Sequence, residues 1–75
     1  MPYIAIKAYP KDEETKREVA EAINRIFLEK WGCPQQAISI SFEEYPPEEW
    51  QKTVFEGEIK QKEDSMFFLS GEKKY

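Results

Sequence analysis

The fold is decided by a stretch at the start of the chain, Pro2-Tyr3-Ile4-Ala5-Ile6-Lys7-Ala8-Tyr9. Within it, Ile4, Ile6 and Ala8 alternate with residues of the opposite face, and this period of two is typical of a strand packed on one side. Pro10 follows and ends the strand, because its ring fixes φ and it has no N–H to donate. We therefore expect a strand over residues 3–9.

A helix of about five turns is expected next, between Asp12 as the N-cap and Gly32 at the C-terminal end. A second alternating run over residues 38–43 predicts another strand. A strand, a long helix and a strand form a βαβ unit, whose two strands run parallel with a right-handed crossover. Two strands alone are not a stable sheet.

The last thirty residues are less regular. Pro47 suits the first position of a short helix or 3₁₀ turn that includes Trp50, and we expect the helix to continue through residues 53–59. The apolar segment Met66–Leu69 is expected to serve as a strand or as a clamp on a partner subunit. Residues 71–75 are expected to be frayed.

The composition limits the classes of protein to consider. The 75 residues make one domain, and with a single cysteine and no histidine the chain has neither a disulfide nor the commonest metal ligand, so we expect no metal site. So short a chain needs a partner, and homo-oligomerisation is the remaining route. A net charge of -4 without a basic stripe argues against nucleic acid, and the absence of a long apolar run argues against a membrane span or signal peptide. We expect a soluble, cytoplasmic protein.

The lack of histidine also excludes Ser-His-Asp and Cys-His nucleophile systems, so Cys33 is interpreted as a passive thiol. Pro2 is the candidate that remains. Its small size permits removal of Met1, which would leave a secondary amine at the end of a rigid strand. An α-amino group titrates near ~7.7–8.0, and burial or a nearby cation lowers that value toward the pH at which a general base works best. The alternative is that the proline ring merely begins the strand.

Three segments together resemble the tautomerase superfamily: the proline-headed strand over residues 2–10, the strand Ile38–Ser41, and residues 47–59 around Trp50. The similarity is greatest to the 4-oxalocrotonate tautomerase-like members of the bacterial PptA type. It implies an α+β fold, a βαβ subunit of the MIF-like kind with a short C-terminal helix. It also implies a sheet completed by oligomerisation, for which we favour a dimer with one four-stranded sheet over a hexamer.

The same resemblance implies roles for individual residues. Pro2 matches the catalytic proline, and Lys11 falls where the family has an arginine that holds a substrate carboxylate. Ser39 replaces a second arginine, which favours a monoacid such as a phenylpyruvate-like 2-keto acid over a dicarboxylate. Trp50 is expected to form an apolar wall, or alternatively to pack in the core.

The implied activity is a keto–enol tautomerisation that needs no cofactor, with Pro2 as the general base. Two alternatives stay open. A related Pro2-dependent hydratase, dehalogenase or decarboxylase would use the same proline as an acid. A non-catalytic interaction module would use the apolar segments only to build an oligomer, and retention of Met1 would favour it.

Overall fold

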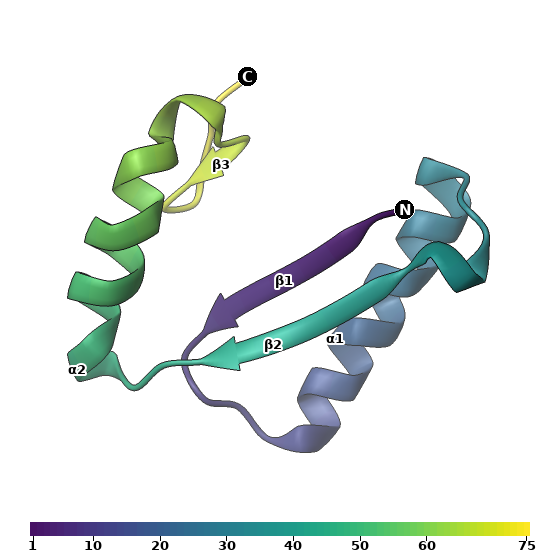
Figure 1. Cartoon of the computed structure of the whole chain (residues 1–75), viewed down its shortest axis with the longest axis horizontal. Coiled ribbons are helices and arrows are strands. Elements are labelled where there is room, and N and C mark those ends of the chain that lie inside the picture. Colours follow the sequence, from purple (N-terminus) through teal and green to yellow (C-terminus); the bar gives the residue numbers. More distant parts are fainter. The chain divides into compact units, whose positions relative to one another are not determined.

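The computed structural model describes residues 1–75, which fall into two compact units, Met1–Tyr45 and Pro46–Tyr75 (Figure 1). The first unit has the order β1 (Tyr3–Ala8), α1 (Glu13–Ile26), η1 (Phe27–Trp31), η2 (Gln35–Ala37) and β2 (Ser39–Glu44). The second has α2 (Pro47–Trp50), η3 (Gln51–Ile59), η4 (Lys60–Ser65), β3 (Phe68–Leu69) and β4 (Glu72–Lys73). The chain is a small α+β protein, as the sequence predicts.

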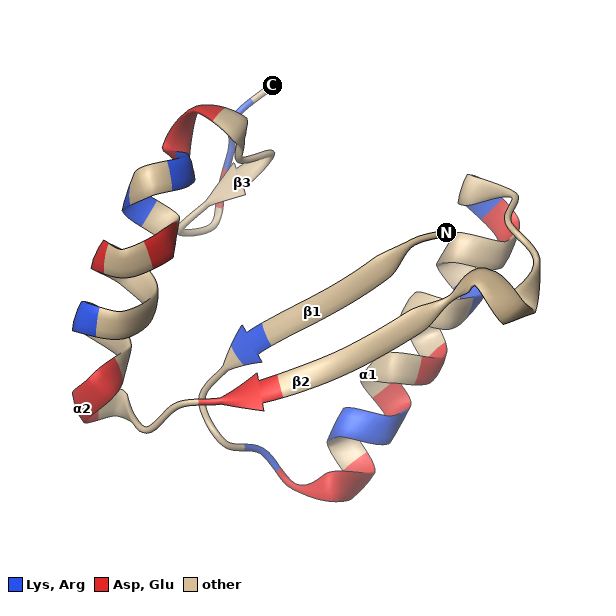
Figure 2. Ribbon diagram, viewed as in Figure 1, with Lys and Arg blue, Asp and Glu red and all other residues tan.

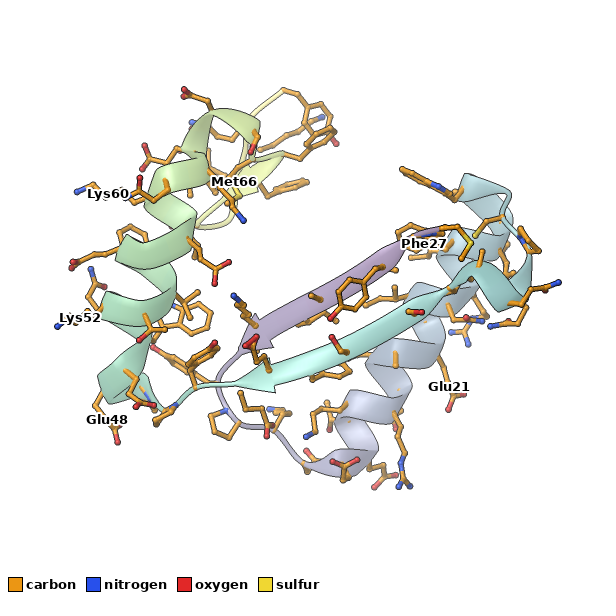
Figure 3. The ribbon with its side chains drawn as sticks, viewed as in Figure 1. Glu21, Phe27, Glu48, Lys52, Lys60 and Met66 are labelled. Atoms are coloured by element: carbon orange, nitrogen blue, oxygen red, sulfur yellow. The ribbon has the colours of Figure 1, made fainter.

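The first unit is the expected βαβ unit. β1 and β2 pair in parallel along their whole length, from Tyr3 opposite Ser39 to Ala8 opposite Glu44. α1 connects them and covers one face of the two strands (Figure 1). That face carries Glu44, whose carboxylate lies 3.2 Å from the Lys16 ammonium on α1. Glu21, on the other side of the helix, points away from the strands (Figure 3).

Both ends of the long helix are set by the residues that the sequence singles out. The Asp12 carboxylate accepts the Thr15 N–H at 2.9 Å and so satisfies one of the first free amides. At the other end, the wider π-helical turn η1 closes with a bond from the Gly32 N–H to the Phe27 carbonyl at 3.1 Å. Gly32 has φ of +76°, a left-handed conformation that favours glycine because it has no Cβ.

The return from the helix to β2 is held by a pair of amides. The Asn24 and Gln35 side chains donate to each other, at 2.9 and 2.8 Å, and so join α1 to η2. Ala37, the last residue of η2, is 7% exposed and lies in the core of the unit. These contacts place the start of β2 beside the start of β1.

In the second unit, Pro47 stands at the start of α2, and the helix continues through η3, as predicted. Its core residue is Val54, which is 3% exposed. Glu48, Lys52 and Lys60 point away from this helix (Figure 3). The second unit thus buries Val54 and leaves these three charged side chains exposed to water.

The C-terminal segment corrects one prediction. Residues 71–75 are not simply frayed, because β4 pairs antiparallel with β3 and the Lys74 N–H donates to the Phe67 carbonyl at 2.8 Å. The turn between them uses two left-handed residues, Ser70 (φ +51°) and Gly71 (φ +83°). The apolar segment at 66–69 therefore contributes a strand to a hairpin in its own chain. The hairpin packs the Tyr75 ring 5.4 Å from Phe67, between ring centres.

Candidate active site

Pro2 immediately precedes β1 and lies at the amino end of the two-stranded sheet. Its carbonyl accepts the Ser39 N–H at 3.2 Å, so the first hydrogen bond between the strands fixes the proline residue itself. Pro2 is half-buried, whereas the Met1 before it is 96% exposed. The structure therefore brings two of the predicted site residues, Pro2 and Ser39, to one end of the sheet.

Ser39 belongs to the sheet face that α1 leaves uncovered. Residues paired in a parallel register share a face, so Ser39 shares this one with Tyr3, and Ser41 follows two residues later. The Tyr3 hydroxyl and the Ser41 Oγ lie 2.9 Å apart in a hydrogen bond. The side chain of Tyr3 is 68% exposed, so a row of three hydroxyl groups extends over this face from its amino end.

Sequence reasoning did not single out Tyr3 and Ser41. The signal was present, because period-two alternation places Tyr3 on one face of its strand and both serines on one face of theirs. What joins the two sets is the register of β1 against β2, which the alternation within each strand does not fix.

Lys11 lies at the opposite end of the sheet. Its N–H donates to the Glu44 Oε2 at 2.8 Å, and Glu44 is the last residue of β2, as Ser39 is the first. Five residues of a parallel strand span about 17 Å, whereas an extended lysine side chain reaches only about 6 Å. The chain after Pro10 therefore does not double back, and the structure does not bring Lys11 to the Pro2 of its own chain.

The apolar residues of β2 lie on the opposite face of the strand from Ser39 and Ser41. Ile40 and Phe42 are half-buried and alternate with the serines of β2, so they lie on the face that α1 covers. Trp50 is the last residue of α2, in the second compact unit, and is also half-buried.

The charges of the sheet gather at its carboxyl end. Lys7 is the only charged residue of β1, and Glu43 and Glu44 are the only ones of β2 (Figure 2). The Lys11 N–H and then the Lys16 ammonium, both hydrogen-bonded to it, hold the pKa of the Glu44 carboxyl below its usual value. The strands are uncharged around Pro2 and Ser39.

Cys33 is partly buried, and its Sγ donates a weak hydrogen bond to the Phe27 carbonyl at 3.6 Å. This contact holds the thiol against the end of the helix. No group of three or more histidine, cysteine, aspartate or glutamate side chains is placed to bind a metal ion. No helix is both long and apolar enough to cross a membrane.

A family model described as "Tautomerase enzyme" matches residues 2–62. The chain is 32% identical over 68 residues to Tautomerase PptA of Pectobacterium atrosepticum, which covers 88% of this chain and 90% of that protein. It is 34% identical over 61 residues to Tautomerase PptA of Escherichia coli O127:H6, covering 79% and 80% of the two chains.

Proposed function

Because the chain belongs to the tautomerase family, we propose that it interconverts the keto and enol forms of a small 2-keto acid such as phenylpyruvate, without a cofactor. The general base is the amino group of Pro2, which removal of Met1 makes free. One observation carries this proposal: Pro2 is half-buried and held to β2 by its carbonyl, while the neighbouring Met1 is 96% exposed. An aminopeptidase can therefore reach Met1 without disturbing the strand.

The proposed chemistry is a proton transfer within one substrate. The lone pair of the Pro2 nitrogen takes the proton of the enol hydroxyl, and the electrons of the O–H bond form the carbonyl. The carbon at the other end of the conjugated system then takes the proton back from the same nitrogen, and the electrons of the C=C double bond form the new C–H bond. Because every proton taken is given back, no oxidant, reductant or metal enters the balance.

The surroundings of Pro2 support its role as a base. Pro2 is half-buried, and the residues of β1 and β2 nearest to it in the sheet carry no charge. The hydroxyl of Ser39 is available as a donor near the same strand end. Because serine carries no charge where the family has an arginine, a monoacid fits the proposed site better than a dicarboxylate.

Lys11 is proposed to bind the substrate carboxylate of a site in a second copy of the chain. The support is the separation of Lys11 from its own Pro2 by nearly the length of β2. An antiparallel partner strand would bring the carboxyl end of one β1 to the amino end of the other. Trp50 is proposed as an apolar wall that limits the size of the substrate.

We propose that the working form is a homo-oligomer, with a dimer favoured over a hexamer. Only Ala37 and Val54 are buried in the single chain, and large apolar side chains such as Trp31 (69%) and Phe67 (72%) are exposed. A partner that covers such residues would supply the apolar burial that a chain of this length lacks.

We propose that residues 1–75 form one domain, because the family match over residues 2–62 extends from the first compact unit into the second. The free, partly buried Cys33 and the acidic surface suit a cytoplasmic location, where thiols stay reduced.

The test is a variant with leucine inserted between Met1 and Pro2, since a bulky second residue prevents removal of methionine and leaves Pro2 as an amide. Ketonisation of the phenylpyruvate enol should fall by about 10²–10⁴-fold, the usual cost of losing a positioned base. Intact-protein mass should confirm loss of Met1 from the wild type and retention in the variant, and circular dichroism should show both folded. Undiminished turnover by the blocked variant would refute the role of Pro2 as the base, whereas no turnover by either protein would favour a non-catalytic interaction module.

A further inference from the structure

Glu44 ties the end of β2 to the loop between β1 and α1. It is in register with Ala8, the last residue of β1, and its carboxylate lies on the face that α1 covers. Its Oε2 accepts the Lys11 N–H at 2.8 Å and lies 3.2 Å from the Lys16 Nζ. One carboxylate oxygen at the end of a strand thus joins a loop and a helix that lie about thirty residues earlier in the sequence.

This contact fixes the backbone at Lys11 from one side, and the helix cap fixes it from the other. Asp12 accepts the Thr15 N–H through its side chain, and its carbonyl accepts the Lys16 N–H at 3.2 Å. The Lys11 ammonium itself makes no hydrogen bond and no ion pair in the chain, and the side chain is exposed. A fixed backbone therefore presents a cation that is available to an anion.

Lys16 makes the arrangement compatible with an anionic substrate. A bare carboxylate next to the Lys11 backbone would repel a substrate carboxylate that approaches the same loop. The Lys16 ammonium lies 3.2 Å from Glu44 and 3.1 Å from the Glu13 carboxylate, which offsets much of this charge. The lowered pKa of Glu44 keeps it an ionised, strong acceptor at neutral pH.

We infer that Glu44 is a positioning residue for Lys11: its carboxylate holds the loop so that the Lys11 ammonium meets the substrate carboxylate, while Lys16 balances its charge. This inference rests on the proposed function, in which Lys11 binds the substrate. Glu44 does not touch the substrate. Its loss should weaken substrate binding and leave the rate of proton transfer at Pro2 nearly unchanged.

The test compares Glu44→Ala with the wild type on phenylpyruvate and on its methyl ester, which has no carboxylate charge. KM for the acid should rise about tenfold, with kcat nearly unchanged, because displacing an anchor by an ångström can cost up to ~10²-fold. KM for the ester should stay near the wild-type value. Glu44→Gln should recover part of the loss, because its amide oxygen can still accept the Lys11 N–H. If Glu44→Ala does not fold, Glu44→Gln replaces it, and its KM for the acid should rise while its KM for the ester stays near the wild-type value.

Glu43→Ala is the matched control. Glu43 is the neighbouring carboxylate on the uncovered face, where it accepts the Tyr45 hydroxyl at 2.8 Å and lies 4.0 Å from the Lys7 ammonium. Its removal should leave the ratio of acid to ester KM unchanged. An equal rise in both KM values for Glu44→Ala would overturn the inference, because it would indicate a general structural defect.

A double variant separates this inference from the proposed function. In the Lys11→Ala background, Glu44→Ala should have no further effect on KM for the acid. If Lys11→Ala raises KM and Glu44→Ala alone does not, the inference fails and the proposed role of Lys11 stands. If Lys11→Ala leaves KM unchanged, the role of Lys11 fails, and the inference fails with it.

Discussion

Subunits that lack a free Pro2 and subunits that carry Lys11→Ala should recover activity when they are mixed. The first variant has leucine inserted before Pro2, so that its own base is blocked while its Lys11 is intact. The second keeps a free Pro2 but has lost the cation. If each site takes Pro2 from one chain and Lys11 from its partner, a mixed dimer contains one complete site.

The structure indicates that Pro2 and Lys11 of one site come from different chains, and the mixing ratio sets the expected recovery. Pro2 is bonded to the first residue of β2 and Lys11 to the last, so a site within one chain would have to bridge about 17 Å with a side chain that reaches about 6 Å. Random exchange of equal amounts makes half of the dimers mixed, each with one site in place of two. Activity should therefore reach about a quarter of the wild-type value.

That recovery exceeds the activity expected of either parent. The blocked variant should retain about 10⁻²–10⁻⁴ of the wild-type rate, and Lys11→Ala should lose about 10- to 100-fold in kcat/KM through the missing charged hydrogen bond. The assay is enol ketonisation at low substrate, before and after subunit exchange verified by native mass spectrometry. A control mixture pairs the blocked variant with a chain that carries both changes and should stay inactive. No recovery in the test mixture after verified exchange would refute a site shared between subunits.

Four further outcomes are expected. Light scattering should show an oligomer, and a stable, folded monomer at micromolar concentration would contradict the proposed homo-oligomer. Asp12→Ala should lower the thermal midpoint at neutral pH, because the Thr15 N–H and hydroxyl hold the pKa of the Asp12 carboxyl below its ordinary value of 3.8. The stability that Asp12 contributes should be present above pH 3.8 and disappear as the pH falls through the lowered pKa. An equal loss at all pH values would argue against the cap. Gly32→Ala should destabilise the chain by about 1 kcal/mol in urea unfolding, since φ is +76° there although a Cβ would meet nothing within 4 Å, and an unchanged midpoint would show that the turn relaxes. Asn24→Ala should cost about 1 kcal/mol, and Gln35→Ala should add little to it, because the two amides bond to each other; additive losses would indicate separate roles.

The βαβ unit could be predicted from the sequence because its signals are local. Apolar and polar residues that alternate along a run of about six residues predict a strand. A carboxylate at Asp12 and a glycine at Gly32 mark the ends of a helix wherever the rest of the chain lies. Pro2 was found for the same reason, since its position behind Met1 is a property of the sequence. Such features depend on bonds within a few residues.

The C-terminal hairpin was missed because its signal is weak. Ser70 and Gly71 form the turn with two left-handed residues, and only glycine adopts that conformation readily. The strands that it joins are two residues each, too short for alternation to be read. Their pairing became visible only in the structure.

For the candidate site, sequence determined the residue types and tertiary structure determined which of them meet. Pro2, Lys11 and Ser39 were predicted from the sequence as site residues. Register alone decided that Pro2 lies beside Ser39, with Tyr3 and Ser41 on one face, and that Lys11 lies at the far end with Glu44. The reason is physical: a strand's own pattern fixes which side chains share its face, but pairing between segments more than thirty residues apart depends on how the whole crossover packs.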